Sequence, residues 1–225
     1  MAPGAPAPLS SETRATRNAL ARLAQRYHGL GWLFGTSGNL SARVETPAGP
    51  RIVITASGCD KGDLGVDDFV ELSLNGDVLG AGAGKRPSAE TSIHLAVYQA
   101  QSATHAVLHV HSVASTQLEM PETDANDPGW ELRGFEMIKG WGRWEEDAEA
   151  FFPAFTNHPH VPDIATDVTG YMNTAEEPVP ALLIVKHGLT AWGNSIFEAH
   201  RHLEVAEFFC RLLAASDGES VKTRA

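Results

Sequence analysis

The residues best suited to chemistry in this chain are histidines at the ends of two apolar runs. His109 and His111 lie in the run 105–112, whose β-branched residues are typical of a buried strand. Side chains two positions apart on a strand point to the same face, so both imidazoles could bind one divalent ion. Taken alone, such a pair is as typical of two buried histidines bonded to neighbouring carbonyl groups.

A third histidine strengthens the metal interpretation. The second apolar run, 180–186, leads directly into His187, and Gly188 lets the backbone turn closely there. Three protein nitrogens leave one coordination position open, which is typical of a catalytic zinc and not of a structural one. The working hypothesis is therefore a catalytic zinc site made by the three histidines.

Two short segments rich in glycine and hydroxyl groups are candidates for binding an anion. They are 35–41 (Gly-Thr-Ser-Gly-Asn-Leu-Ser) and 55–58 (Thr-Ala-Ser-Gly). Backbone N–H groups and hydroxyls of this kind can surround a phosphate, although most such loops are only turns. Two carboxylates are candidate site residues of a different kind. Glu90 is expected in the first turn of a helix, and Glu136 has the alternative of a solvated ion pair with Lys139.

The bulk composition excludes several classes of function. A formal net charge of −11 argues against nucleic acid or an anionic membrane surface as the main partner. Cys59 and Cys210 are too few for a disulfide framework, and no apolar run reaches the ~20 residues of a membrane span. The opening segment lacks the features of a signal peptide. We therefore expect a cytoplasmic protein of one domain, for which an anionic small substrate is not excluded.

Helical and strand patterns are interspersed along the chain. The sequence predicts helices after Ser10 or Ser11, over 87–99 and 112–118, and from 194 or 195 to about 214. It predicts a hairpin over 69–79 with a two-residue Asn75-Gly76 turn. It also predicts a short acidic helix over 145–150, followed by mostly loop over 151–162. Together these patterns predict a three-layer α/β domain with a mixed sheet.

Five segments, in their order and spacing, resemble the class II aldolase superfamily of zinc-dependent sugar-phosphate enzymes. They are 35–41, 55–58, 87–90, 109–112 and 187–188. The resemblance covers 10–215, so we expect one catalytic domain there between tails at 1–9 and 216–225. It implies a three-layer αβα fold with a nine-stranded, largely antiparallel central sheet. It also implies a homotetramer with the active site near a subunit boundary.

The resemblance also assigns roles to individual residues. It implies one Zn²⁺ per subunit, held by His109, His111 and His187. It implies a sugar-phosphate substrate bound by the loops that carry the following residues: Asn39, Ser57, Gly58, Ser88 and Glu90.

The segment 134–140, with Glu136, Met137 and Lys139, resembles a dehydratase branch of the superfamily. That likeness implies loss of water from a 2-ketose 1-phosphate, with Glu136 as the general acid–base. Two alternatives remain open. One is a sugar-phosphate aldolase that cleaves a carbon–carbon bond, and the other is a non-catalytic protein that zinc only stabilises.

Overall fold

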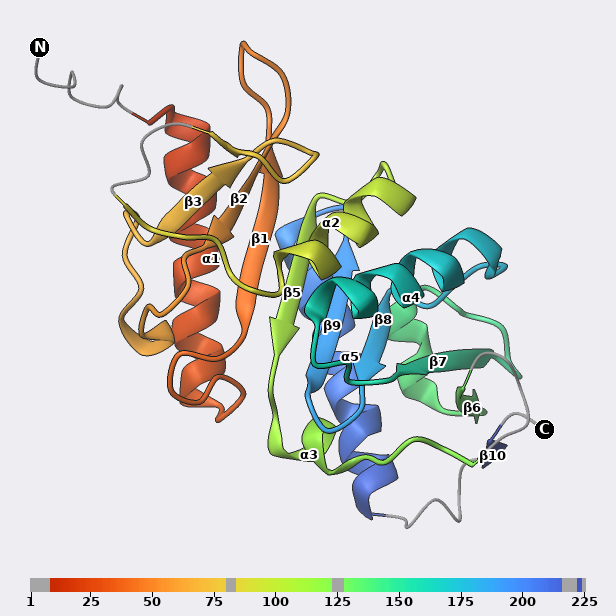
Figure 1. Ribbon diagram of the computed structural model, residues 1–225. Helices are drawn as coiled ribbons and strands as arrows, with labels where there is room; N and C mark the ends of the chain where they lie inside the picture. The colour runs from red at the N-terminus through yellow and green to blue at the C-terminus, as the bar shows by residue number, and fades with distance from the viewer. Residues whose placement is uncertain (1–8, 80–83, 123–127, 216–221, 224–225) are drawn as a thin grey trace, which may run out of the picture.

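A mixed β-sheet forms the middle layer of the molecule in the computed structural model, which describes residues 9–79, 84–122, 128–215 and 222–223 (Figure 1). Its strand order is β10-β6-β7-β8-β9-β5-β1-β2-β3-β4. The strands are β1 (Asn39–Val44), β2 (Arg51–Thr55), β3 (Phe69–Leu72), β4 (Val78–Leu79), β5 (Ala106–Val110), β6 (Gly129–Arg133), β7 (Glu149–Phe155), β8 (Ala181–Ile184), β9 (Gly188–Gly193) and β10 (Lys222–Thr223).

Helices cover both faces of this sheet. They are α1 (Ser11–Gly29), α2 (Thr91–Ala100), α3 (Val113–Gln117), α4 (Val161–Thr174) and α5 (Ile196–Ala215), with the short 3₁₀ helices η1 (Lys61–Asp63) and η2 (Glu136–Trp141). Within the described residues, β7 and β8 are the one parallel pair of neighbours and the other strand pairs are antiparallel. The predicted three-layer fold with a largely antiparallel sheet is therefore confirmed. The nine expected strands are joined at one edge by the two-residue β10.

The alternation of side chains along β5 separates two hydrophobic cores. Leu108 and Val110 pack into the core that α1 and α5 cover, whereas Val107 packs into the core under α2 and α4. All three are fully buried, so β5 is covered on both sides. Because side chains alternate, His109 lies on the same face as Val107 and therefore points toward the α2 and α4 layer.

The stretch 145–162 corrects the sequence prediction. An acidic helix and a loop are expected there, but the structure has strand β7. Phe152 and Ala154 of this strand belong to the α5-side core, whereas Phe155 belongs to the α4-side core. A strand buried on both faces reads as a continuous apolar run instead of an alternating one. That pattern, interrupted by Pro153, is why the strand was not predicted.

The hairpin of β3 and β4 is present, but its turn differs from the prediction. The loop comprises residues 73–77, since β3 ends at Leu72 and β4 begins at Val78. Within it, the Ser73 hydroxyl accepts hydrogen bonds from the backbone N–H groups of Asn75 and Asp77. Gly76 has φ +91° within this longer loop. The helix prediction at the N-terminus is confirmed, since Ser10 caps α1 by accepting from the Thr13 N–H.

The predicted tails lie mostly outside the described residues. Residues 1–8, 216–221 and 224–225 are not described, so the domain bounds 10–215 stay a prediction. Of the helices that the structure describes, none combines the length and apolar character needed to cross a bilayer.

Candidate metal centre

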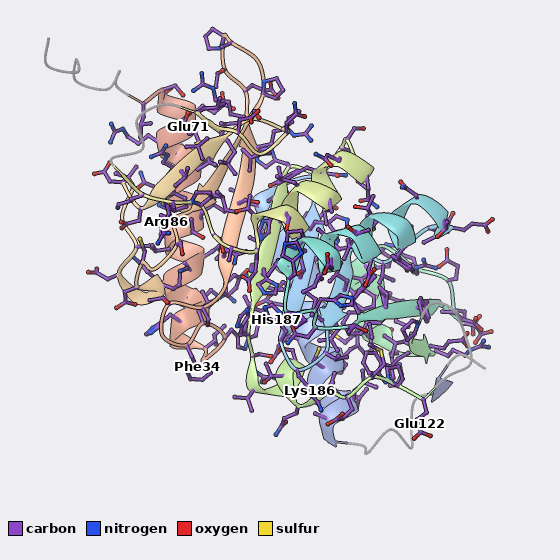
Figure 2. The ribbon with its side chains drawn as sticks, viewed as in Figure 1. Phe34, Glu71, Arg86, Glu122, Lys186 and His187 are labelled. Atoms are coloured by element: carbon purple, nitrogen blue, oxygen red, sulfur yellow. The ribbon has the colours of Figure 1, made fainter. Side chains whose placement is uncertain are left out.

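Three histidines come together where β5 ends and where β8 turns into β9. His109 lies in β5, His111 follows the strand, and its backbone N–H donates to the carbonyl of Trp32. His187 occupies the tight turn between β8 and β9, in which Lys186 has φ +56°. Figure 2 shows His187 near the middle of the molecule. The histidines of the two apolar runs of the sequence therefore lie close together in the structure.

The donor atoms of this cluster are close enough to share one ion. One nitrogen each of His109, His111 and His187 and one carboxylate oxygen of Glu90 lie within 4.8 Å of one another. Glu90 Oε1 lies 2.6 Å from His187 Nε2, 3.6 Å from His111 Nε2 and 3.7 Å from His109 Nε2. The rings are nearly perpendicular to one another, with centroids 4.8–5.2 Å apart. We call these four residues the metal centre.

Neighbouring side chains contact the Nδ1 atoms of two of the rings. His109 Nδ1 bonds to the Thr190 hydroxyl at 2.8 Å, and His187 Nδ1 lies 3.1 Å from Asn157 Oδ1. Antiparallel pairing places Thr190 directly opposite His109, so strand register alone makes the first contact. Such contacts fix the ring orientation and leave Nε2 as the ligand atom. The pairing of His109 with Thr190 depends on β9 lying next to β5, which is not visible in the sequence.

Burial and charge keep His109 and Glu90, two of the four groups, in the forms that bind metal. Burial lowers the pKa of His109 well below its ordinary value, which favours the neutral imidazole. Burial also raises the pKa of Glu90, but the neighbouring imidazoles of His109, His111 and His187 outweigh that effect. The net pKa of the Glu90 carboxyl is well below its usual range, so this group is ionised.

Three imidazole nitrogens and a carboxylate suit a divalent transition ion such as Zn²⁺. The site is also accessible from one side, because the side chains of His111 and His187 are 23% and 13% exposed while that of His109 is 1% exposed. The structure thus fits the predicted metal. Glu90 takes a position that differs from its expected first-turn location, since it is the residue immediately before α2.

The segments expected to bind phosphate lie beside the metal centre. Asn39 begins β1, pairs with His109 across the sheet and donates from Nδ2 to the Ser88 hydroxyl at 2.9 Å. Ser57 and Gly58 are exposed, and the Ser57 N–H donates to the Arg86 carbonyl at 2.9 Å. The structure therefore brings the two predicted loops and the segment before α2 together. Their contacts with a substrate stay a prediction.

Lys61 is a feature of this region that the sequence reasoning missed. Its side chain is buried, and Nζ donates to the carbonyl oxygens of Thr36 and Cys59, each at 3.0 Å. Burial lowers the pKa of this ammonium group. Lys61 thereby ties the glycine-rich loop before β1 to the loop after β2. A lysine is mostly exposed in folded proteins, so its sequence position gave no sign of this role.

Glu136 does not join the metal centre of its own chain. It begins η2, its side chain is 82% exposed, and it forms an ion pair with Lys139 at 2.9 Å. Helix η2 packs on α5, where Trp141 Nε1 donates to the His202 carbonyl. That is the face of the sheet opposite to His109. The segment that carries Glu136 is a 3₁₀ helix in the structure.

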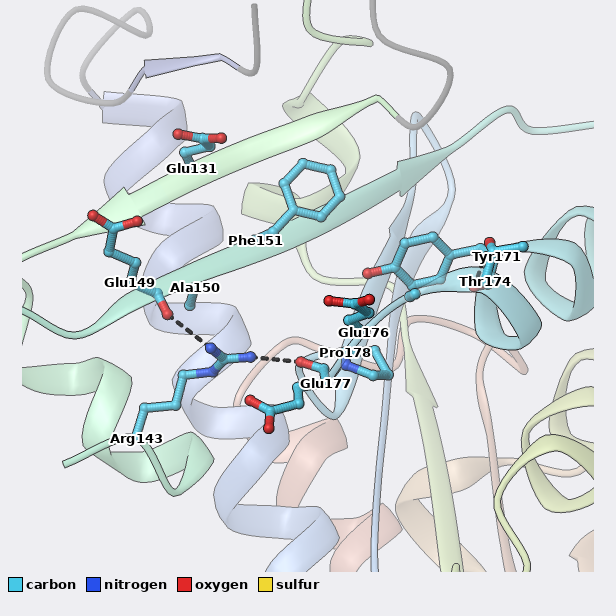
Figure 3. Close-up of a pocket in the computed structure, with 11 residues that line it drawn as sticks. Glu131, Arg143, Glu149, Ala150, Phe151, Tyr171, Thr174, Glu176, Glu177 and Pro178 are labelled. Atoms are coloured by element: carbon cyan, nitrogen blue, oxygen red, sulfur yellow. Dashed lines mark hydrogen bonds between the residues drawn. The ribbon is translucent and has the colours of Figure 1, made fainter. Parts of the chain in front are cut away.

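A separate hollow of about 480 Å³ lies at the other end of the sheet, between β7 and the end of α4 (Figure 3). Its arginine, Arg143, donates to the backbone carbonyls of Glu149 and Glu177. The guanidinium is therefore held by the protein itself. The metal centre, and not this hollow, brings together the residues suited to catalysis.

Comparison with known proteins gives a consistent likeness. Residues 18–214 match the family model described as "Class II Aldolase and Adducin N-terminal domain". The chain is 40% identical over 201 residues to a methylthioribulose-1-phosphate dehydratase of Microcystis aeruginosa, with 89% of this chain and 95% of the relative covered. It is 39% identical over 201 residues to the protein of the same name from Leptospira biflexa, covering 87% and 94% of the two chains.

Solved structures support the fold. The crystal structure of YgbL from Escherichia coli superposes with a TM-score of 0.72 at 25% identity, covering 95% of each chain. An L-fuculose 1-phosphate aldolase superposes with a TM-score of 0.69 at 20% identity, covering 93% of this chain and 88% of that chain. At 20% identity, the second likeness concerns the fold alone.

Proposed function

Because this chain belongs to the class II aldolase and adducin N-terminal domain family, we propose that it is a metal-dependent lyase that dehydrates 5-methylthioribulose 1-phosphate. The product is 2,3-diketo-5-methylthiopentyl 1-phosphate, which places the reaction in methionine salvage. The observation that carries this proposal is the gathering of three imidazoles and Glu90 around one point. The 40% identity to a named dehydratase over most of the chain supports the choice of substrate.

The reaction removes the proton on C3 of the ketose and expels the hydroxyl on C4. His109, His111 and His187 would hold a divalent ion, with Zn²⁺ the expected one, which supplies Lewis-acid stabilisation of developing negative charge. The loops that carry Asn39, Ser57, Gly58 and Ser88 would bind and orient the phosphate. Lys61, which is buried and donates to the backbone carbonyls of Thr36 and Cys59, adds positive charge beside those loops.

A carboxylate has to take the C3 proton and return a proton to the leaving hydroxyl. We assign this role to Glu136 and a metal-binding or supporting role to Glu90. Glu90 Oε1 faces the three imidazoles and Oε2 accepts from Asn39, so both of its oxygens are already engaged. Glu136, by contrast, is exposed and lies on the opposite face of the sheet. In this proposal it reaches the metal centre of another subunit.

A homotetramer with the site at a subunit boundary provides that arrangement. Exposed apolar side chains flank the centre: Val113, two residues after His111, is 57% exposed and Phe34 is 56% exposed. An interface that covers this region would remove both side chains from water, which is favourable. The oligomer is part of the proposal, and its size is measured directly by mass analysis of the native protein.

The test is incubation of the zinc-loaded protein with 5-methylthioribulose 1-phosphate, followed by mass spectrometry. Loss of one water from an intact carbon chain is expected. Two shorter carbon fragments would instead identify an aldolase. A His109→Ala variant that folds but has no turnover is expected for a catalytic metal. A non-catalytic zinc-stabilised protein would give no product even before the substitution.

A further inference from the structure

A buried hydrogen-bonded chain leads from α2 to the metal centre. Tyr98 OH lies 2.9 Å from Ser41 Oγ, which lies 2.7 Å from His94 Nδ1. His94 Nε2 lies 2.5 Å from Asn39 Oδ1, and Asn39 Nδ2 donates to Glu90 Oε2. The four residues that precede Glu90 in this series of hydrogen bonds are each at most 3% exposed: Tyr98, Ser41, His94 and Asn39. The chain therefore runs through the protein interior and ends on a group of the metal centre.

The Glu90 carboxylate at the end of this series fixes which group donates and which accepts in every hydrogen bond of the series. The ionised Glu90 carboxylate only accepts hydrogen bonds, so the amide nitrogen of Asn39 must face it. Asn39 Oδ1 then faces His94, and His94 Nε2 must carry the hydrogen. His94 Nδ1 consequently accepts from the Ser41 hydroxyl, and Ser41 in turn accepts from Tyr98. All donors point toward the metal centre.

The surroundings of His94 agree with this single arrangement. Burial lowers the pKa of His94 to about 4, so the imidazole is neutral at ordinary pH. A neutral imidazole has one donor and one acceptor nitrogen, which are the two roles that Asn39 and Ser41 require. Both hydrogens of the Asn39 amide are also used, one on Ser88 and one on Glu90.

We propose that His94 is a positioning residue of the metal centre, which acts through Asn39 on Glu90. By donating from Nε2, His94 prevents the amide from turning its oxygen toward the Glu90 carboxylate. The amide nitrogen then holds Oε2 while Oε1 faces the three imidazoles. This inference rests on the metal binding in the proposed function but not on the identity of the substrate.

Two substitutions separate the two contacts of the imidazole. The amide nitrogen of Gln is as many bonds from Cα as Nε2 of His, and that of Asn is as many as Nδ1. His94→Gln therefore keeps a donor for Asn39, whereas His94→Asn keeps a polar group only near Ser41. Each variant breaks one buried hydrogen bond, so the two are matched for loss of stability.

The measurement is competitive titration of the metal-free proteins with Zn²⁺ against a chromophoric chelator, without substrate. His94→Asn is expected to weaken zinc binding about 10–100-fold, as loss of a group behind a metal ligand typically does. His94→Gln should bind zinc nearly as the unaltered protein does. Melting temperatures of the metal-free variants should be similar, which shows that the difference in zinc affinity does not come from unfolding.

Equal zinc affinity in the two variants overturns this inference alone. Failure of the unaltered protein to bind zinc overturns the metal centre and this inference together. Two-bond ¹H–¹⁵N spectra of the unaltered, metal-free protein test the same point without any substitution. An Nε2–H tautomer of His94 supports the inference, and an Nδ1–H tautomer contradicts it.

Discussion

Glu90 and Glu136 are carboxylates of the same type in very different surroundings. Glu90 has three imidazoles on one oxygen and an amide on the other, and its side chain is 14% exposed. Glu136 has one ion pair with Lys139 and is 82% exposed. The first is fixed in place by the protein, whereas the second can exchange its partner at little cost because an exposed ion pair contributes little.

Substitution of each carboxylate by its amide should separate these roles. Glu136→Gln is expected to lower turnover about 10²–10⁴-fold, the usual contribution of a general acid–base, with bound zinc unchanged. Glu90→Gln is expected to lower zinc affinity as well, because the imidazoles lose their anionic partner. Steady-state kinetics and metal analysis of the purified variants measure both quantities.

Near-normal turnover of Glu136→Gln would remove this residue from the mechanism. A Glu90→Gln variant that keeps its zinc but loses all turnover would assign the proton transfer to Glu90 instead.

Sequence reasoning at the residue scale succeeded where a local pattern contained the information. The period of two along β5 placed His109 and His111 together, and an apolar run ending in His187 added the third imidazole. The partners of these residues come from other elements. The spacing of the sequence assigns no role to His94, because its contacts with Asn39 and Ser41 depend on how α2 lies across β1.

At the scale of elements, the close approach of β9 to β5 shapes the metal centre. A Cβ at Gly188 would lie 2.4 Å from the carbonyl oxygen of Val110 and 2.8 Å from Cδ2 of His111. Only glycine fits there without moving β9 or the His111 ring. Gly193, at the other end of β9, is equally crowded, since its Cβ would lie 2.6 Å from the backbone nitrogen of Ala199.

These two glycines form a matched pair for an experiment. Gly188→Ala and Gly193→Ala should each lower the free energy of unfolding by about 1–3 kcal/mol, because both overpack the interior. Only Gly188→Ala should also weaken zinc binding, since only that substitution displaces a histidine of the centre. Denaturant unfolding of the metal-free proteins and zinc titration measure the two effects. A comparable loss of zinc affinity in Gly193→Ala would contradict this local role for Gly188.

The elements that the sequence predicted well are those with a clear signature. α1 has its cap at Ser10 and a helical stripe, and β5 lies in an apolar run with β-branched residues. β7 was missed because its residues are buried on both sides and therefore lack alternation. η2 was missed because a short 3₁₀ helix has no periodic pattern of its own.

For the whole molecule, the sheet separates the two groups that the proposed reaction needs. His109 points toward the α2 and α4 layer, and Glu136 begins the helix that packs on α5. One chain therefore does not bring Glu136 to its own metal centre. A symmetric assembly with head-to-tail contacts can place one surface of each subunit against a different surface of the next. In such an assembly every active site contains residues from two subunits.

Mixed assemblies test this arrangement directly. His109→Ala loses the metal centre but keeps Glu136, and Glu136→Gln loses the carboxylate but keeps the centre. Each variant alone should be inactive. After dissociation and reassembly of an equal mixture, about one quarter of the sites should combine an intact centre with an intact neighbouring Glu136, since each condition holds for half of the subunits. Turnover of the mixture should therefore recover toward about a quarter of that of the unaltered protein. Native mass spectrometry establishes that hybrids have formed, and hybrids without any recovered turnover would show that both groups must belong to the same chain.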